Sequence, residues 1–292
     1  MVTSEREAVK QTFLQESWTS CNLWSIAPSL GKEAGMGFSG KTALVTGAAG
    51  AIGQGIAAAL VQGGARVFIT DLKQEAVDAA VNAVGAGALG LAADVTDEAE
   101  VKAVVAAAAS AFGHQVDILV NVAGIVGQGK VEELTVEQWD AVFAVNCKGT
   151  FLLCKHVVPL MKARKYGKII NFSSKSGKTG SALMSHYSAA KAAIIGFTQA
   201  LAYELADSNI NVNCLCPGIV LETGVWSHVS AGYVKNLGLP KEEVVKKFTS
   251  KVPLGRLAAI KDVVAVTLFL ASEGADYMTG QAINVTGGRE MH

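Results

Sequence analysis

Short apolar runs alternate with longer helical patterns along the chain from residue 41 onward. The runs consist mostly of β-branched or aliphatic residues and span 41–47, 65–71, 87–95, 116–124, 167–174 and 210–218. Continuous apolar runs of this length are typical of parallel strands that are buried on both faces. The alternation predicts an α/β fold, a Rossmann-type doubly wound parallel sheet of about seven strands with helices on both faces, in a single domain.

The segments between the runs are rich in alanine, and two of them carry clear signals of a helix start. Asp97 with Glu100, and Thr135 with Gln138, have the spacing of a capping box. In this motif the first side chain accepts from a backbone N–H three residues on, and the second reaches back. We therefore expect helices to begin after Asp97 and after Thr135.

Two segments depart from the alternation. Residues 1–35 contain no long apolar run, so we expect neither a signal peptide nor a membrane span there. We predict an N-terminal extension or arm, with Met36 as the functional start of the domain at 36–292. Residues 223–250 are polar and mixed in charge, and "KEEVVKKF" is their clearest helical pattern. We predict that they form a lid that closes over the substrate and excludes water.

Composition limits the choice of partners. The chain has 292 residues, half of them hydrophobic, and a formal net charge of zero, so we expect neither a nucleic-acid nor a membrane partner. Its five cysteines are odd in number and scattered through apolar elements, which favours reduced thiols in a cytoplasmic protein over a disulfide framework. Cys214 and Cys216 lack the spacing of a zinc knuckle, and no metal site is predicted.

Three glycines mark the turn between the first strand and the first helix. Gly47, Gly50 and Gly53 stand in "TALVTGAAGAIGQG", directly after a strand pattern and at the start of a helical one. Glycine permits the tight turn and lets backbone N–H groups approach a pyrophosphate held at the helix N-terminus. The alternative is a plain glycine-rich turn without a ligand. The strand–turn–helix context favours a dinucleotide site.

Polar residues follow the next three strands at the edge where open α/β sheets bind ligands. Asp71 ends the second strand, where its carboxylate would accept from the adenosine ribose and repel a 2′-phosphate, so NAD is favoured over NADP. Lys73 nearby slightly weakens this preference. Asp94 is placed to reach the adenine ring or, alternatively, only to begin the next turn. Asn121 ends the fourth strand at the same edge.

Tyr187 and Lys191 lie one helical turn apart at the start of an apolar helix, in "SHYSAAKAAIIGFTQAL". Residues four apart share a helix face. They are either ordinary helix-surface groups or a proton donor and the charge that tunes it. The pair alone does not distinguish these interpretations.

Taken in order, these residues resemble the short single-domain branch of the short-chain dehydrogenase/reductase family over residues 37–288. The matching pieces are Thr46-Gly47 with the glycine turn, Asp94-Val95, "NVAG" at 121–124, Asn146, Ser174, Tyr187-x-x-x-Lys191, Pro217-Gly218, and "FLAS…TGQAINVTGG" at 269–288. The resemblance implies an NAD-dependent oxidoreductase that interconverts a secondary alcohol and a ketone by hydride transfer.

The resemblance also implies the residues of the catalytic site. Tyr187 would be the general acid or base, and Lys191 together with the positive nicotinamide would stabilise its phenolate and lower a pKa of ~10. Ser174, preferred over its neighbour Ser173, would donate to the substrate oxygen, and Asn146 would position a water in a proton relay. The implied cofactor contacts are Gly47, Gly50, Ile52, Gly53, Asp71, Asp94, Val95, Asn121, Ala123, Gly124, Tyr187, Lys191, Pro217, Gly218, Val220 and Thr223.

The chain departs from the family pattern at three places. Ala51 stands at the usual middle glycine, so the spacing of the glycines matches the longer sugar-nucleotide epimerase branch. Val122 replaces the second Asn of the usual "NNAG". Glu222 occupies the usual Thr position after the Pro-Gly pair, which puts the cofactor contact of Thr223 in doubt.

The substrate is indicated less clearly. The lid and the C-terminal segment resemble sorbitol-6-phosphate and related polyol dehydrogenases, which implies a sugar alcohol or its phosphate. Lys175 and Lys178 follow Ser174 and would meet a phosphate or carboxylate, or else be solvated loop lysines. Trp226 and His228 are further candidates for the polyol pocket.

Two other functions stay open. One is the reduction of a 3-oxoacyl thioester on an acyl carrier protein, which generally uses NADPH and is disfavoured by Asp71. The other is a non-catalytic regulator that binds the cofactor, for which an intact proton relay is not needed. The resemblance further implies a homodimer or homotetramer built through the helices near 136–163 and 187–206.

Overall fold

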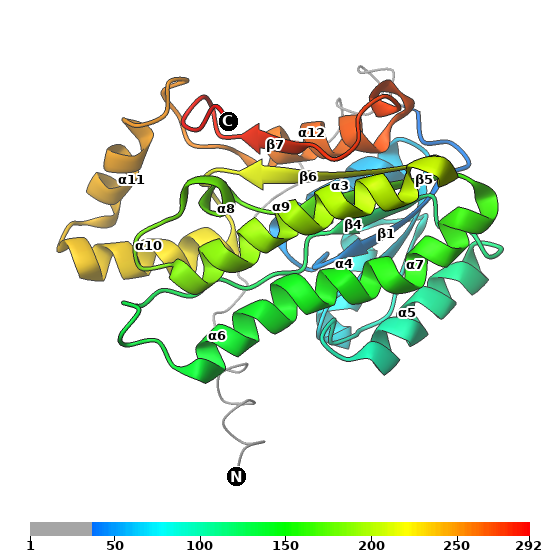
Figure 1. The fold of residues 1–292 in the computed structure, drawn as a ribbon, viewed down its shortest axis with the longest axis horizontal. Helices are drawn as coiled ribbons and strands as arrows, with labels where there is room; N and C mark the ends of the chain where they lie inside the picture. Colours follow the sequence, from blue (N-terminus) through cyan, green and yellow to red (C-terminus); the bar gives the residue numbers. More distant parts are fainter. Residues whose placement is uncertain (1–36) are drawn as a thin grey trace, which may run out of the picture.

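The computed structural model describes residues 37–292, apart from the side chains of 235–237. The predicted arm at 1–35 and the proposed start at Met36 lie outside the described residues. The described chain forms one sheet of seven parallel strands in the order β3-β2-β1-β4-β5-β6-β7, which confirms the predicted fold (Figure 1). The strands are β1 (Thr42–Thr46), β2 (Arg66–Thr70), β3 (Ala88–Gly90), β4 (Ile118–Asn121), β5 (Gly167–Phe172), β6 (Ile210–Pro217) and β7 (Ala282–Val285).

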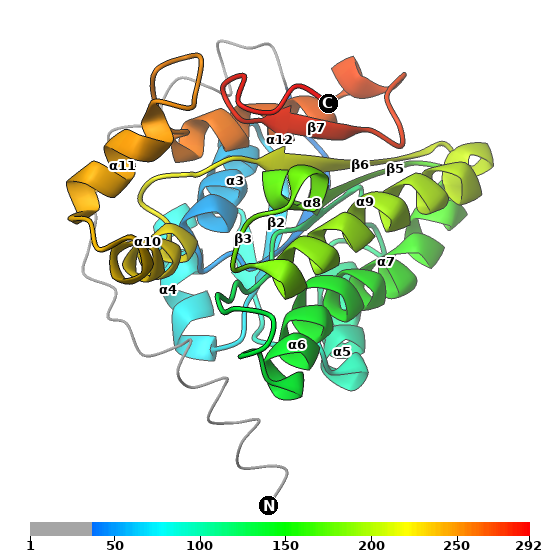
Figure 2. The same ribbon diagram turned by 60° about the vertical axis from the view of Figure 1, so that its left-hand side comes forward.

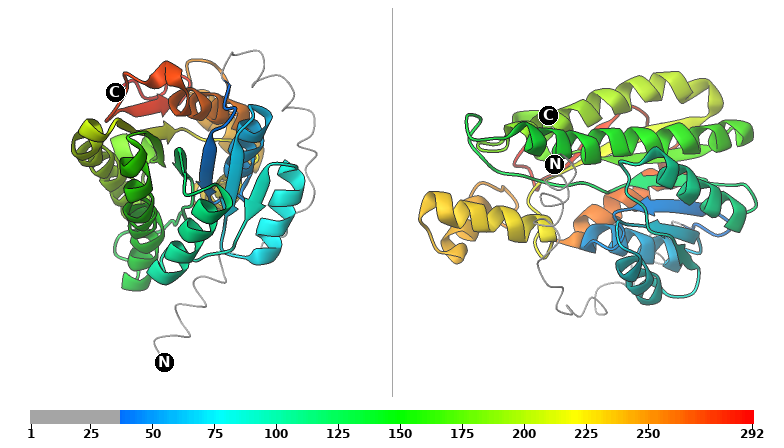
Figure 3. Two further views of the ribbon diagram at one scale, coloured as in Figure 1. Left: turned by 90° about the vertical axis from the view of Figure 1, so that its right-hand side faces the viewer. Right: turned by 90° about the horizontal axis from the view of Figure 1, so that it is seen from below.

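Helices cover both faces of the sheet, and each layer has its own core (Figure 3). One layer consists of α3 (Ala51–Gln62), α4 (Gln74–Val84) and α12 (Ile260–Ala271). The other layer consists of α5 (Glu98–Ala111), α6 (Val136–Phe143), the π-helix η2 (Ala144–Gly149), α7 (Thr150–Arg164) and α9 (Ser185–Leu205). Strands β1 and β4 are buried along their whole length, because helices pack on both of their faces. This is why their sequences are apolar without alternation.

The third strand is shorter than predicted and ends at Gly90 rather than near residue 95. It is the edge strand, with β2 as its only neighbour among residues 37–292. Beyond Gly90, the amides of Leu91 and Ala93 still donate to the carbonyls of Ile69 and Asp71. The chain therefore stays extended without completing the ladder, and Asp94 lies in a loop.

Both predicted helix starts exist, but only one is a complete capping box. Thr135 accepts from the amide of Gln138 at 3.2 Å, and the Gln138 side chain accepts from the amide of Thr135 at 3.0 Å. Asp97 caps α5, but Glu100 accepts instead from the amide of Asp94 at 2.7 Å. The Glu100 side chain, which the spacing assigned to the capping box, is thus hydrogen bonded to the loop before α5 instead.

The helical segment 136–164 is long and apolar enough to cross a membrane by length and composition. It is instead the packed middle helix of its layer, where Leu152, Leu153, Val157 and Met161 contact the sheet core. Burial of these side chains explains the apolar composition of the segment, and soluble core helices commonly share it.

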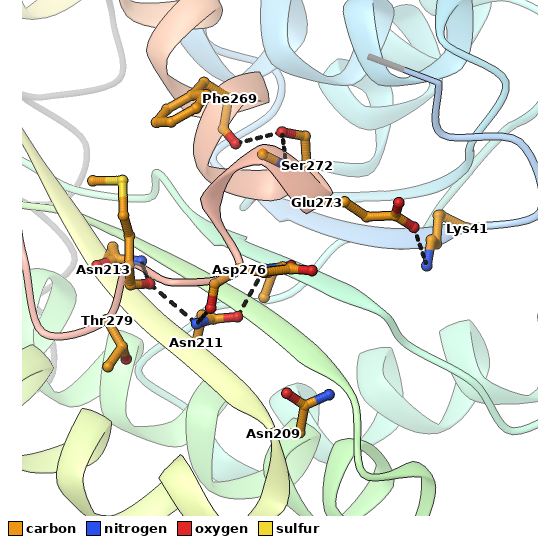
Figure 4. Close-up of polar contacts among 12 residues, drawn as sticks. Lys41, Asn209, Asn211, Asn213, Phe269, Ser272, Glu273, Asp276 and Thr279 are labelled. Atoms are coloured by element: carbon orange, nitrogen blue, oxygen red, sulfur yellow. Dashed lines mark hydrogen bonds and ion pairs between the residues drawn. The ribbon is translucent and has the colours of Figure 1, made fainter. Parts of the chain in front are cut away.

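The amino-terminal edge of the sheet is held by polar contacts (Figure 4). Lys168 begins β5, is 1% exposed, and donates to Asn211 at 2.7 Å and to Asp276 at 2.5 Å. Asn211 also donates to the carbonyls of Asp276 and Met278. A surface hollow of about 480 Å³ lies here, next to Tyr277. These contacts join β5 and β6 to the segment before β7, at the edge opposite to the predicted ligand site.

Two helices stand beyond the carboxyl ends of the strands, in the segment predicted as a lid. They are α10 (Gly224–Leu237) and α11 (Lys241–Thr249), and Figure 1 shows them at the end toward which the arrows of β6 and β7 point. Trp226, Val244 and Phe248 form a small apolar core between them. Trp226 is therefore part of the internal packing of this unit, and His228 is exposed on α10.

Candidate active site

The glycine turn leaves no room for side chains. Gly47 has a φ of +63°, and a Cβ there would lie 2.7 Å from the amide nitrogen of Ala123. A Cβ at Gly53 would lie 2.5 Å from the carbonyl oxygen of Gly47, and one at Gly50 would lie 3.2 Å from the same atom. Gly47 and Gly53 are thus needed for the backbone to stay this close, and Gly50 leaves little space for a side chain. The turn ends at the N-terminus of α3, where backbone N–H groups can hold a pyrophosphate.

Asp71 follows β2 and faces this turn. One carboxylate oxygen accepts from the amide of Ala49 at 3.0 Å, and the other accepts from the amide of Leu72 at 2.7 Å. The carboxylate is therefore fixed beside the glycine turn. Lys73 is exposed and begins α4.

Two other predicted cofactor residues, Asp94 and Asn121, lie near the ends of β3 and β4. One carboxylate oxygen of Asp94 accepts from both the amide and the hydroxyl of Thr96, so Asp94 begins the turn before α5, and its contact with the adenine ring stays a prediction. Asn121 is 3% exposed and donates to Asn171 at 2.9 Å within the helix-covered face of the sheet. Its side chain thus joins β4 to β5, and only its backbone lies near the edge.

The loop after β4 and the facing helix bring backbone to the site. The amide of Ala123 donates to Thr46 at 3.1 Å, and this bond joins the loop to the end of β1. Val95 packs against η2, where a Cβ at Gly149 would lie 2.7 Å from its side chain. Ile52 lies in the first turn of α3.

Asn146 lies in η2, a π-helical interruption between α6 and α7. Such interruptions occur frequently at functional sites. Its amide nitrogen donates to the carbonyls of Val142 and Ile125, both at 2.9 Å. Its side-chain oxygen is buried and has no hydrogen-bond partner among residues 37–292. A buried acceptor of this kind is normally satisfied by water, as the predicted relay requires.

Gly124 marks where Asn146 and Lys191 converge. A Cβ there would lie 2.6 Å from the unpartnered Asn146 oxygen and 3.3 Å from the Lys191 ammonium. The π-helical interruption positions the Asn146 side chain, and the lack of a side chain at Gly124 leaves room for it. Asn146 and Lys191 therefore both lie next to the loop after β4.

Tyr187 and Ser174 form the reacting end of the site. Ser174 caps the short helix α8 (Lys175–Thr179) by accepting from the amide of Ser176 at 3.1 Å, and it hydrogen bonds with the Tyr187 phenol. Ser173 points elsewhere and donates to the Lys191 carbonyl at 2.7 Å. Ser174 is therefore the serine beside the tyrosine.

In the protein chain alone, burial dominates the ionisation of both groups, and the predicted lowering of the phenol pKa by Lys191 and the nicotinamide together stays a prediction. Burial raises the pKa of Tyr187 to about 12, opposed by the hydrogen bond with Ser174. Burial also lowers the pKa of Lys191 to about 8. The ammonium donates to the carbonyl of Phe172 at 2.8 Å and lies 5.7 Å from the centre of the tyrosine ring. At neutral pH the site thus holds a neutral phenol, suited to donate a proton, beside a cation.

The segment after β6 runs from the sheet edge into the lid. Gly218 follows Pro217 and donates to Val285 at 3.1 Å, and Val220 makes a bridge with Ala258. The Thr223 hydroxyl donates to the carbonyl of Val220 and accepts from Trp226, so it caps α10. This capping role leaves the hydroxyl with partners of its own, in line with the doubt raised by Glu222.

The two lysines after Ser174 lie in the short helix α8 and are half-buried, each with partners in the protein. Lys178 donates to the carbonyl of Ala282 at 2.7 Å and joins α8 to β7. Lys175 lies near Glu290, with 4.0 Å between the charged atoms. Glu290 and its neighbour Arg289 were not predicted from the sequence, because they form no motif and are simply two charged residues after the last strand.

Comparisons with known proteins agree with this geometry. Residues 47–290 match the family model described as enoyl-(acyl carrier protein) reductase. The chain is 39% identical to sorbitol dehydrogenase of Cereibacter sphaeroides and 40% identical to galactitol 2-dehydrogenase of Agrobacterium fabrum, in each case over 257 residues that cover 88% of this chain and 100% of the relative. It is 36% identical to the 3-oxoacyl-(acyl-carrier-protein) reductase of Escherichia coli over 256 residues, which cover 88% of this chain and 100% of that enzyme.

The chain is also similar to a solved structure over most of its length. The crystal structure of 3-ketoacyl-(acyl-carrier-protein) reductase from Brucella melitensis complexed with NADH matches with a TM-score of 0.80 at 34% identity, covering 87% of this chain and 100% of the other. The chain belongs to the short-chain dehydrogenase/reductase family. It is an oxidoreductase that acts on CH–OH groups with a nicotinamide cofactor, NAD(H) or NADP(H).

Proposed function

We propose that this protein is an NAD-dependent dehydrogenase that interconverts a secondary alcohol of a polyol and the corresponding ketone. The observation that carries the proposal is the meeting of Ser174, Tyr187 and Lys191 at the same sheet edge as Asp71. The catalytic trio of Ser174, Tyr187 and Lys191 would transfer a proton at the substrate oxygen. Asp71 would select NAD over NADP. Two relatives named for sugar-alcohol oxidation support the polyol.

The glycine turn and Asp71 would hold the adenosine half of NAD, and Lys191 would hold the nicotinamide ribose. When bound, the cofactor supplies the hydride acceptor or donor. Ser174 orients the substrate oxygen by hydrogen bonding. Tyr187 gives a proton to that oxygen when a ketone is reduced and takes it when an alcohol is oxidised. A water on the free oxygen of Asn146 would link Lys191 to solvent.

The competing function is reduction of a 3-oxoacyl thioester, which the relative from Escherichia coli and the solved relative from Brucella melitensis support. Initial rates of NADH formation from NAD distinguish the two, with a panel of free and phosphorylated polyols and a repeat with NADP. We expect at least one polyol to be oxidised with NAD. Silence across the panel, with active reduction of a 3-oxoacyl thioester, would replace the proposal with the competing function.

Replacing Asp71 with Asn is expected to shift cofactor preference toward NADP. The change keeps the side chain's shape and an acceptor oxygen but removes the charge that repels a 2′-phosphate. Hydrogen bonds to charged groups contribute about 1.5–3 kcal/mol, so the ratio of kcat/KM for NAD over NADP should fall roughly 10- to 100-fold. Asp78→Asn, an exposed change on α4, is the matched control and should leave the ratio unchanged.

The protein is also proposed to be a cytoplasmic homodimer or homotetramer, as the family resemblance implies. Large side chains are exposed on the helices expected to form the contact: Trp139 is 42% exposed, Phe151 is 45% and Tyr203 is 89%. We expect light scattering to give a mass of two or four chains. Tyr203→Glu would place charges in the contact and should lower that mass, and a monomeric mass for the unchanged protein would contradict the proposal.

A further inference from the structure

The C-terminal tail places two charged side chains beside Lys175, the residue next to the catalytic serine. The Arg289 guanidinium lies 3.2 Å from a carboxylate oxygen of Glu290, and the Lys175 ammonium lies 4.0 Å from the same oxygen. The three side chains are only 14%, 16% and 7% exposed for Lys175, Arg289 and Glu290. We call these three residues the tail cluster.

The backbone fixes Glu290 in this place. Its carbonyl accepts from the side chains of Asn284 and Thr286, both at 3.1 Å, and its amide donates to the Thr286 hydroxyl at 3.3 Å. The tail therefore folds back onto the end of β7 rather than extending away. This anchoring sets the direction of the glutamate without help from its carboxylate.

A chain of contacts runs from the tail cluster through the lid to the catalytic tyrosine. Arg289 lies 5.6 Å from the centre of the Phe248 ring on α11, and that ring lies 4.8 Å from the ring of Tyr233 on α10. Tyr233 packs in one apolar cluster with Met184 and Tyr187. Lys175 directly follows Ser174 at the start of α8, so the tail cluster lies close to the catalytic serine. Figure 2 shows α8 and the two lid helices α10 and α11 at the same end of the sheet.

Glu290 has a hydrogen-bonding capacity that the described chain does not use. Its second carboxylate oxygen is buried and has no partner among residues 37–292, and the same is true of the side-chain oxygen of Asn284. A buried carboxylate oxygen without a donor is costly, and it can be satisfied only by a group that donates. Lys175 and Arg289 beside it donate and cannot accept.

We propose that the tail cluster binds the hydroxyl groups of an uncharged polyol away from its reacting carbon. A hydroxyl both donates and accepts, so it can give its hydrogen to Glu290 and accept from Lys175 or Arg289. A phosphate group in the same place would accept from Lys175 and Arg289 but has no hydrogen to give at neutral pH, so the buried oxygen of Glu290 would stay without a donor. The tail cluster thus selects the free polyol over its phosphate. This inference rests on the proposed function and narrows its substrate.

The test compares Glu290→Gln with the unchanged protein on one free polyol and its phosphate, measuring KM and kcat separately. The unchanged protein should show kcat/KM at least about tenfold higher for the free polyol. In the variant, KM for the free polyol should rise about tenfold or more with little change in kcat, since a hydrogen bond to a charged group is lost. The discrimination against the phosphate should narrow, because the cluster gains net positive charge. Glu273→Gln, whose carboxylate pairs with Lys41 at the opposite edge, is the matched control and should change neither constant.

Other outcomes overturn the inference. If Glu290→Gln lowers kcat or thermal stability and leaves KM for the polyol unchanged, the tail cluster is only a latch for the C-terminus. A preference of the unchanged protein for the phosphate reverses the proposed selection. If it oxidises no polyol at all, the proposed function fails and the inference fails with it. Should the glutamine variant not fold, Lys175→Met removes the partner cation, and an unchanged KM there would likewise overturn the proposal.

Discussion

Tyr187→Phe is expected to lose roughly 10²- to 10⁴-fold in kcat in both directions, the usual contribution of general acid–base catalysis. The substitution removes only the phenolic oxygen, so packing against Met184 is kept. NAD should bind nearly as before, because the glycine turn and Asp71 are untouched. Stopped-flow rates of hydride transfer and a titration of NADH fluorescence measure the two effects separately. If the protein were only a cofactor-binding regulator, the unchanged protein and the Tyr187→Phe variant would not differ in either measurement.

The pH profile adds a second signature for Tyr187. Oxidation needs the phenolate, and the pKa of the phenol is raised to about 12 in the protein without cofactor. The kcat/KM for oxidation should therefore rise with pH through the neutral range, whereas reduction should fall at high pH. Tyr187→Phe should flatten both profiles. Tyr277→Phe, a fully exposed tyrosine at the opposite edge, is the matched control, and a comparable loss of turnover there would count against this assignment.

The fold followed from local sequence, because strands buried on both faces must be continuously apolar. The runs around Leu44 and Val120 show this directly, and both strands are fully buried. Strand ends were less predictable. The third run continues to Val95 in sequence, yet the strand ends at Gly90, because an edge position with a single neighbour decides where pairing stops.

The choice of Ser174 over Ser173 was predictable from the interval to Tyr187 that the family resemblance supplied. Ser174 lies beside Tyr187, and Ser173 is turned away toward the Lys191 carbonyl. The direction of a side chain was less predictable. Asn121 ends β4 at the carboxyl edge, as predicted, but its amide donates to Asn171 on the neighbouring strand, a contact that depends on strand pairing.

Contacts distant in sequence account for most of what was missed. Lys175 meets Glu290, more than a hundred positions along the chain, only because α8 and the tail after β7 lie at the same edge. The pKa of Lys191 likewise depends on burial by several elements. A tyrosine and a lysine one turn apart reveal a shared helix face, but they do not reveal how much water reaches either group.

Lys191→Met is expected to abolish turnover and yet to stabilise the fold at neutral pH. The ammonium is 5% exposed, and its folded-state pKa of about 8 lies below the ordinary value of 10.5. A lowered pKa means that protonation at pH 7 costs the folded state about 3 kcal/mol, at 1.36 kcal/mol for each pKa unit. Methionine has a similar stem and no charge. It also loses the bond to the Phe172 carbonyl, which offsets about 1–2 kcal/mol, so a net gain of about 1–2 kcal/mol is expected.

The pH dependence of that gain separates removal of a buried charge from a general improvement in packing. Between pH 8 and 10.5 the unfolded chain keeps the Lys191 proton while the folded chain releases it, so this group makes the unchanged protein more stable as pH rises. The advantage of Lys191→Met should therefore be largest below pH 8, vanish between pH 8 and pH 10.5, and give way above that range to a deficit of about 1–2 kcal/mol from the lost bond to Phe172, in urea unfolding at a series of pH values. Lys168→Met is the control, since that buried ammonium has a carboxylate partner in Asp276 and its loss should destabilise without affecting turnover. A Lys191 variant less stable at every pH would show that the ammonium supports the fold, whereas the expected result would show that the site keeps its cation for catalysis at the expense of stability.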